Sequence, residues 1–343
     1  MDTASRTPSD PVADAVAALR LLARRQRGVF TWGQALALGI PVGMAATTVR
    51  RGDWYRLRRG VYAFAEEVWE RAGDDWAMHH LRCAAEVLAL GFDPVVSHES
   101  AARLHRMHHL GGRPARPVIS RQRHRDDERS ERRGLYVVQL PASHVTVVEG
   151  VAAATPARTA VDLARRDGLL AGVVAADAAL WVGASPDDLD AVARHCWHWP
   201  GGATGREAVA AARWGAQSAL ESIGRRALVE RDAPEPELQV DVVRWGQLLG
   251  VADMAWRDLL LVAEADGAVK YERPWAARPL LEEKRRQEDF EQCGLAVLRY
   301  DWDESWSRPG ELYARWRAKA ATAGSRQLAP GVELRPRGSR RAA

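Results

Sequence analysis

The first 65 residues are divided by glycine and proline into segments so short that few folds can accommodate them. An apolar repeat over residues 13–27 predicts an amphipathic helix that ends at Gly28. Two shorter helical segments follow, at 32–38 and 44–51. Residues 54–64 then alternate apolar and polar side chains, which predicts a β-hairpin. Three helices followed by a hairpin are the order of a winged helix-turn-helix.

Arginine is concentrated in the third helix and the hairpin. Between residues 48 and 60 Asp53 is the single acid among five arginines, whereas the whole chain has a formal net charge of only +4. Such clustering is typical of phosphate-binding surfaces, and a helix in this position enters the major groove. A protein-interaction module with a solvated basic face is the alternative. The residues predicted to bind DNA are Thr47, Thr48, Arg50, Arg51, Arg56, Arg58 and Arg59.

The same segment resembles a known family. Residues 28–41 and 54–63, within a match over about residues 15–65, are similar to the N-terminal winged-helix domain of AbiEi-type antitoxins from type IV toxin–antitoxin systems. The resemblance implies binding to promoter DNA, autoregulation of transcription, and a cognate toxin as a partner.

A second group of residues, near the C-terminus, is suited to metal chemistry. Residues 251–256 and 259–267 flank a tight turn, and a loop of two or four residues would pair Asp253 with Val262. Asp253, Glu264 and Asp266 would then project from one face of a hairpin and could bind Mg²⁺ or Mn²⁺ for phosphodiester hydrolysis. Lys270 would polarise the phosphate. The predicted catalytic residues are Asp253, Glu264, Asp266, Lys270 and Glu221, of which the first three are the predicted metal ligands.

Two ordinary structural explanations compete with this hypothesis. Acids along the solvent face of a hairpin are routine, although a run as apolar as residues 259–263 predicts a buried strand. Glu221 lies three residues after Ser218, which is a capping-box pattern, so it is either a helix cap or a residue that supports the metal site.

Residues 218–302 resemble the nuclease-like domains related to very-short-patch repair endonucleases, within the PD-(D/E)XK superfamily. The matching residues are Glu221, Ser222, Arg225, Asp253, Glu264, Asp266, Gly267, Lys270, Tyr271, the segment 283–286, Gly294 and the segment 297–299. The resemblance implies that Asp253 and Glu264 carry the metal. The lysine expected two residues after the acid is replaced by Asp266, so Lys270 would have to supply that charge or activity would be lost.

The length of 343 residues predicts several domains. We expect an α/β multidomain protein with a winged helix-turn-helix over 13–65, a mixed α/β middle domain over 66–215, and a restriction-endonuclease-like α/β domain over 216–318. Residues 319–343 are predicted to be a disordered basic tail. The middle domain is a candidate protein-interaction surface.

Other classes of protein are disfavoured. Cys83, Cys196 and Cys293 lie too far apart for a disulfide framework or a paired-cysteine zinc site, and a signal peptide and membrane span are not recognisable. We therefore expect a cytoplasmic protein without a membrane partner. Phosphate-binding glycine motifs are also missing, so no nucleotide cofactor is expected. The leading hypothesis is a DNA-binding protein with a Mg²⁺-dependent endodeoxyribonuclease domain. The alternative is a non-enzymatic antitoxin or transcriptional regulator on an inactive nuclease fold.

Overall fold

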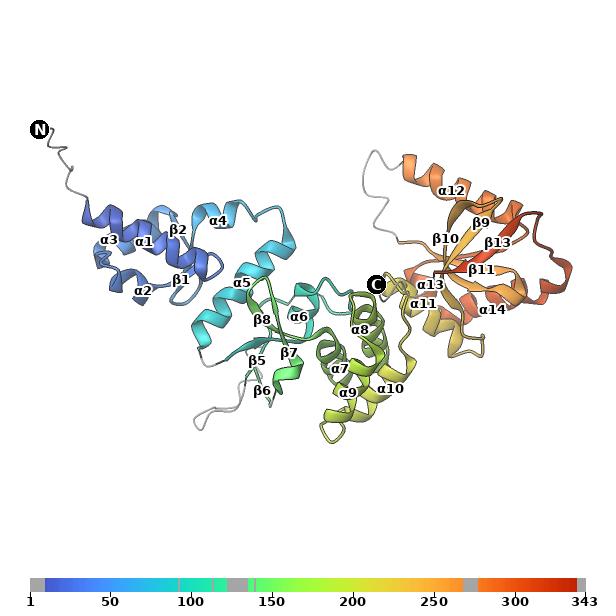
Figure 1. The fold of residues 1–343 in the computed structure, drawn as a ribbon, viewed down its shortest axis with the longest axis horizontal. Helices are drawn as coiled ribbons and strands as arrows, with labels where there is room; N and C mark the ends of the chain where they lie inside the picture. Colours follow the sequence, from blue (N-terminus) through green and yellow to red (C-terminus); the bar gives the residue numbers. More distant parts are fainter. Residues whose placement is uncertain are drawn as a thin grey trace, which may run out of the picture. The chain divides into compact units, whose positions relative to one another are not determined.

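The chain forms two compact units, one of residues 1–107 with 111–159 and the other of residues 108–110 with 160–343 (Figure 1). Within the described residues no helix is both long and apolar enough to cross a membrane. The structure is a computed structural model that describes residues 10–91, 93–112, 114–121, 135–138, 140–267 and 277–337.

Three helices and a small antiparallel sheet of order β1-β3-β2 begin the first unit. Thr31 starts the second helix, because its hydroxyl accepts from the Gln34 N–H while the Gln34 side chain accepts from the Thr31 N–H. The predicted hairpin is confirmed, with Trp54 opposite Phe64. The arrangement is consistent with a winged helix-turn-helix. Its elements are α1 (Pro11–Arg25), β1 (Val29–Thr31), α2 (Trp32–Ala37), α3 (Val42–Arg51), β2 (Trp54–Arg58) and β3 (Val61–Phe64).

This small sheet is apolar on both faces, and every residue of β3 is buried. One face packs on α1–α3, where the Phe30 and Trp54 rings meet edge to face with centroids 4.9 Å apart. The other face packs on the helix α5, in a core that contains Val29, Val61, Ala63, Leu81 and Ala84. The predicted boundary at residue 65 therefore does not separate two compact units. The division between units lies at residues 159 and 160.

The rest of the first unit is a mixed sheet of order β6-β5-β4-β8-β7 that packs with α5 and α6. In this sheet β4 is antiparallel to β5 and parallel to β8. The elements are α4 (Ala65–Trp69), α5 (Asp75–Leu90), β4 (Val95–Val96), α6 (His98–Leu104), β5 (Ile119–Arg121), β6 (Leu135–Val137), β7 (Val145–Val148) and β8 (Val151–Ala154).

The second unit combines a helical part with an α/β part whose sheet has the order β12-β11-β10-β9-β13. Strands β11 and β12 are parallel and the other pairs are antiparallel. Helix α12 covers one face of the sheet, and α11 and α14 cover the other (Figure 1). The elements are most of α7 (Pro156–Asp167), α8 (Leu169–Trp181), α9 (Pro186–His195), α10 (Gly202–Ala211), α11 (Ala219–Val229), β9 (Glu237–Arg244), β10 (Gln247–Trp256), β11 (Leu261–Ala265), α12 (Ala277–Gln292), β12 (Ala296–Tyr300), α13 (Trp302–Trp306), α14 (Pro309–Ala321) and β13 (Val332–Pro336).

The disordered tail predicted for residues 319–343 is wrong for its described part. Helix α14 continues to Ala321, and β13 adds a fifth strand to the sheet with Leu334 opposite Val242. Gly331, at φ +75°, makes the turn before β13 and lies so close to the Trp245 ring that a β-carbon there would be 2.4 Å from it. Leu334 then packs on the core under α12, which explains why this basic segment is ordered.

A buried ion pair joins α8 to α11. The Arg225 and Asp177 side chains are both fully buried, with Nη2 3.0 Å from Oδ2. Asp177 also accepts from the Ser222 hydroxyl at 2.8 Å and from the Arg213 backbone N–H at 2.7 Å. Arg225 donates in addition to Glu235 at 2.6 Å. Burial raises the pKa of Asp177, and the charge of Arg225 opposes that rise. The burial of these charges is tolerable because each has several partners.

Removing the carboxylate of this pair should destabilise the second unit strongly. Asp177→Ala leaves the Arg225 guanidinium short of a counter-charge, so we expect the free energy of unfolding to fall by about 3–5 kcal/mol. Glu230→Ala, which removes the exposed partner of Arg226 on the same helix, should cost less than about 1 kcal/mol. Urea unfolding followed by circular dichroism measures both, and equal losses would contradict the prediction.

Candidate functional site

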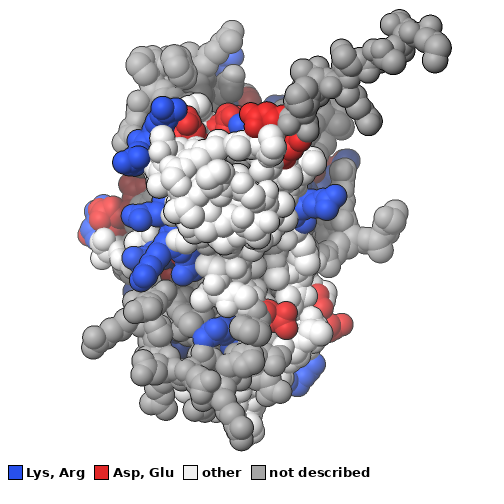
Figure 2. Space-filling view, turned by 90° about the vertical axis from the view of Figure 1, so that its left-hand side faces the viewer, with Lys and Arg blue, Asp and Glu red and all other residues white. Residues whose placement is uncertain are grey.

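The basic surface predicted for DNA binding lies on α3 and the β2–β3 hairpin. Arg50, Arg51, Arg56 and Arg59 are exposed. None of the four forms an ion pair with a carboxylate among the described residues. Figure 2 views the side on which α1–α3 lie in Figure 1 and shows Lys and Arg side chains gathered along one side of that face. Tyr55, half exposed, lies on the same hairpin.

Four of the predicted DNA contacts have other partners in the structure. The Thr47 and Thr48 hydroxyls donate to the backbone carbonyls of Gly43 and Met44, at 2.8 and 2.9 Å, and the Thr47 hydroxyl also accepts from Nη2 of Arg50 at 3.2 Å. Their methyl groups remain for a ligand. Arg58 is ion-paired with Glu86 of α5, and it is the one predicted arginine engaged in this way. We therefore remove Arg58 from the candidate interface. If Arg58 moved to contact DNA, the half-buried carboxylate of Glu86 would lose its counter-charge.

The C-terminal carboxylates meet where β10 and β11 separate. The structure pairs Val262 with Ala255, so the predicted pairing of Val262 with Asp253 is wrong by two residues. The loop has one of the two expected lengths, four residues, but it runs over Arg257–Leu260 with a left-handed Leu260. Trp256 therefore pairs with Leu261, and the register differs from the predicted one. One more step of this register would bring Asp253 opposite Glu264. There the Asp253 carboxylate accepts from the Ala265 N–H at 2.9 Å.

Glu264 is buried on the sheet and faces α12. Its Oε1 lies 3.0 Å from Nε of Arg286 on that helix. Burial raises the pKa of the Glu264 carboxyl; the positive charge of Arg286 opposes the rise and the negative charge of Asp253 adds to it. The positive charge of Arg299 also opposes the rise, more weakly than that of Arg286, and the pKa of Glu264 stays raised.

Glu221 serves as a helix cap and also lies close to the other carboxylates. It accepts from the Ser218 hydroxyl and the Gln217 N–H, both at 2.8 Å, at the start of α11. Burial, with the nearby charge of Asp253 as the second cause, raises the pKa of Glu221 to about 7. Both explanations considered for this residue thus have a physical basis.

The remaining predicted residues do not complete a ligand set. Asp266 is ion-paired with Arg299, whose Nε lies 3.0 Å from its Oδ1. Lys270 lies outside the residues that the structure describes. In the described part of the chain no three His, Cys, Asp or Glu side chains form a group that could hold a metal ion. The structure therefore gathers Asp253, Glu264 and Glu221 but does not arrange Asp253, Glu264 and Asp266 as a three-carboxylate site.

Two residues of this site were not predicted from the sequence. Gln239 lies opposite Asp253 in the sheet register, and its amide donates to Glu221 at 3.3 Å; it adopts φ +53°, a strained backbone that is informative at a functional site. Tyr300 is buried, and its hydroxyl has no hydrogen-bond partner in the described part of the chain. Burial, with Asp253 as the next cause, raises the pKa of Tyr300, so its hydroxyl remains a donor. Gly224 of α11 makes room for it, since a β-carbon there would lie 2.2 Å from the ring.

The raised pKa of Glu221 makes stability depend on pH. The folded chain holds this proton up to about pH 7, whereas an unfolded glutamate releases it near 4.5. Stability from this group is therefore fully present below the unfolded pKa and is lost as pH rises from about 4.5 to about 7. Relative to Glu221→Gln, we expect the wild-type Tm to fall across that window and then to stay level.

Thermal unfolding at several pH values checks this expectation. Glu230→Gln is the matched control, because this carboxylate lies on α11 and pairs with Arg226 at the surface. Parallel curves for wild type and Glu221→Gln would show that burial does not perturb this carboxyl.

Comparison with known proteins covers the N-terminal and middle parts of the chain. Residues 17–65 match the family described as "Transcriptional regulator, AbiEi antitoxin", and residues 94–196 match the family described as "AbiEi antitoxin C-terminal domain". Both matches end before residue 216, so the resemblance of the C-terminal domain to repair endonucleases stays a prediction.

Relatives occur in Mycobacterium tuberculosis. The proteins named "Uncharacterized protein MT2308" (strain CDC 1551 / Oshkosh) and "Uncharacterized protein Rv2248" (strain ATCC 25618 / H37Rv) are each 28% identical over 275 residues, which is 78% of this chain and 92% of the relative. A crystal structure of the RV2827C protein from the same species aligns with a TM-score of 0.32 and 15% identity, over 62% of this chain and 85% of that one. On the family matches, residues 17–65 and 94–196 of this chain are similar to domains of the AbiEi antitoxin family.

Proposed function

We propose that this protein is a DNA-binding transcriptional regulator that contacts duplex DNA through α3 and the β2–β3 hairpin. The observation that carries the proposal is the set of exposed arginines that lack carboxylate partners within the described chain: Arg50, Arg51, Arg56 and Arg59. Arginines that are not neutralised internally can replace the counterions of DNA phosphates. The AbiEi match over residues 17–65 supports the same function, and the family supports a cognate toxin as a further partner.

The division of roles among these residues follows from their positions. Arg50 and Arg51 lie at the end of α3, next to the Gly52 turn, whereas Arg56 and Arg59 lie on the hairpin. Thr47 and Thr48 lie one turn before the helix end, and their methyl groups suit contact with a thymine methyl. We expect the arginines to supply most of the affinity and the threonines part of the sequence preference.

A second candidate function, metal-dependent phosphodiester hydrolysis, is favoured by the carboxylates around Asp253. Burial raises the pKa of Glu221 and of Glu264, and the negative charge of Asp253 adds to both rises. Arg286 and Arg299 oppose the rise at Glu264 only in part, so these carboxyl groups crowd a buried place. A divalent cation would relieve this repulsion. Mg²⁺ commonly uses one or two protein carboxylates together with substrate phosphate and water, so Asp253 and Glu264 fit it without Asp266.

The residues of the chain would have distinct tasks in such a site. Asp253 and Glu264 would hold the cation, which when bound supplies an activated water and stabilises charge on phosphorus. The Tyr300 hydroxyl stays protonated, so the buried tyrosine adds no further negative charge beside these carboxylates. Arg286, which is partly exposed, can exchange Glu264 for a phosphate oxygen.

Loss of the two helix arginines should weaken duplex binding. For Arg50→Ala with Arg51→Ala we expect weaker binding to duplex DNA and a slope of log K against log salt that is smaller by about 2, because two phosphate contacts disappear. Fluorescence anisotropy over a salt series measures both quantities. Arg20→Ala, which removes an exposed arginine of α1 that is paired with Glu66, is the control. A regulator that contacts DNA elsewhere would lose nothing in the double variant.

Binding of Mn²⁺ tests the second candidate function without requiring turnover. Paramagnetic resonance of free Mn²⁺ should show binding to the wild-type chain and at least about tenfold weaker binding to Glu264→Gln. Arg286→Gln should bind Mn²⁺ more tightly than wild type, because the competing guanidinium is gone. Glu230→Gln, at the surface of α11, should leave the affinity unchanged. A wild-type chain that binds no Mn²⁺ would refute the metal site.

A further inference from the structure

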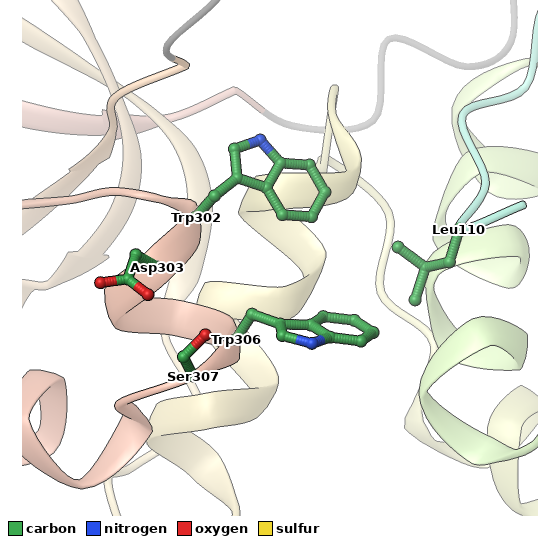
Figure 3. A pocket seen from close by; sticks show the side chains of 5 residues that line it. All are labelled: Leu110, Trp302, Asp303, Trp306 and Ser307. Atoms are coloured by element: carbon green, nitrogen blue, oxygen red, sulfur yellow. The ribbon is translucent and has the colours of Figure 1, made fainter. Parts of the chain in front are cut away.

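The cavity beside α13 does not select a ligand. It has a volume of about 440 Å³ and is lined by Leu110, Trp302, Asp303, Trp306 and Ser307. Figure 3 shows both indoles on the side of α13 that faces Leu110. The acid in the lining, Asp303, is ion-paired with Arg308, whose Nη2 lies 2.7 Å from its Oδ2. Any apolar group of suitable size would fit such a lining. A charged pair in the first unit, by contrast, bears directly on the proposed contact with DNA.

A β-bulge in the hairpin turns Arg58 away from its neighbour Arg56. Side chains two residues apart on a regular strand lie on the same face of the sheet. Here Arg56 lies opposite Tyr62. The register then shifts, and Arg58 lies opposite Val61. Because Val61 and Tyr62 are consecutive, they face opposite sides of the sheet, and paired residues share a face. The bulge therefore places the two arginines on opposite faces.

The face on which Arg58 lies is the one that packs against α5. Val61 belongs to the core that contains Leu81 and Ala84 of that helix. Glu86 lies on the same helix, and its carboxylate is ion-paired with the Arg58 guanidinium. The Arg58 and Glu86 side chains are only 30% and 20% exposed. The pair therefore forms where two parts of the first unit pack together, and not on the open surface of the hairpin.

Arg58 and Glu86 hold each other in place. Burial raises the pKa of the Glu86 carboxyl, and the positive charges of Arg58 and, more weakly, of Arg116 oppose the rise. Within the described chain Arg58 is the only residue ion-paired with Glu86, so Arg116 acts from a greater distance. Removal of one partner of a partly buried pair leaves the other charge uncompensated.

Arg58 is close enough to the tip of the hairpin to reach a DNA phosphate if it is released. It is next to Arg59, whose side chain is exposed, and the α-carbons of adjacent residues are about 3.8 Å apart. An arginine side chain has a long, flexible stem that can turn its charged head towards water. A released Arg58 would therefore join the exposed arginines of the proposed interface.

We propose that Glu86 limits the affinity of this protein for duplex DNA by holding Arg58 against α5. The hairpin then offers Arg56 and Arg59 to phosphate and withholds its third arginine. A phosphate contact strengthens binding to any DNA sequence, so an acid that withholds one makes binding weaker and more easily reversed. Glu86 lies outside the residues 17–65 that match the regulator family, so α5 would set the affinity of the winged-helix part. The inference rests on the proposed DNA-binding function.

Fluorescence anisotropy of the full chain with a labelled duplex over a salt series tests this role. In Glu86→Gln the Arg58 guanidinium loses its counter-charge while Arg116 remains nearby, so it should turn to the DNA. We expect the slope of log K against log salt to become steeper by about 0.9, so that the ratio of variant to wild-type affinity rises about threefold as the salt falls from about 200 to about 50 mM.

The double variant Glu86→Gln with Arg58→Ala shows whether the gain comes through Arg58. We expect the steeper slope and the tighter binding to disappear in it. A gain that persists without Arg58 would overturn the proposal, because it would come from the lost negative charge alone.

Arg58→Ala in the otherwise unchanged chain is a second test that does not depend on how Glu86→Gln folds. It should leave the slope unchanged, whereas Arg59→Ala should make the slope smaller by about 0.9. A smaller slope in Arg58→Ala would show that Arg58 already contacts phosphate, and the proposal would be wrong. Glu66→Gln is the matched control, because it removes an acid of the same unit and frees Arg20 of α1, outside the proposed interface. It should change neither slope nor affinity.

Failure of this inference is distinguishable from failure of the proposed function. If the chain carrying Arg50→Ala and Arg51→Ala loses affinity for duplex DNA but Glu86→Gln keeps the wild-type slope, only the role of Glu86 is refuted. If loss of the α3 arginines changes nothing, the interface itself is refuted, and the role of Glu86 with it.

Discussion

The Arg225–Asp177 pair is the interaction on which the C-terminal site depends. Because the pair is buried, its net contribution to the free energy of folding is small. Its main effect is to fix the positions of the two helices, since a buried guanidinium has few alternative arrangements. The pair fixes α11 against α8, and α11 carries both Glu221 at its start and Gly224 against the Tyr300 ring. A shift of this helix would move the cap, the tyrosine and thereby the start of α13. Resemblance placed Arg225 among nuclease residues, whereas its contacts give it a structural role.

Local structure in the N-terminal part was predictable because it depends on neighbours in sequence. Helix ends follow from glycine, proline and Thr31, and the hairpin follows from its own alternation. The boundary at residue 65 was not predictable in this way. The alternation over residues 54–64 predicts a hairpin, whereas Val61 and Ala63 bury a second apolar face against α5, which lies further along the chain. Long-range packing of this kind leaves only a weak signal, a strand in which every residue is apolar.

At the carboxylate site the sequence predicted the residue types better than their geometry. Asp253 and Glu264 stood out because acids rarely end a run of buried residues. Their pairing depended on a four-residue loop with a left-handed Leu260. The sequence does not indicate this conformation, because the residue at that position is not a glycine. Tyr300 and Gln239 were missed because their importance comes from burial beside other strands. Asp266 was predicted as a metal ligand, but it is ion-paired with Arg299 on the parallel strand β12. The sequence does not reveal this pair, because the two residues are more than thirty positions apart.

The two surfaces that we propose to act on DNA differ in how they can approach a polyanion. The arginines of α3 and the hairpin attract phosphate directly, so monovalent and divalent salts both weaken their contact by competing as counterions. The carboxylates around Asp253 repel phosphate, and the positive charges of Arg286 and Arg299 offset Glu264 only in part. A strand can approach that edge only if a cation, or protons held at raised pKa values, removes the negative charge first. Divalent cations are therefore expected to act in opposite directions at the two surfaces.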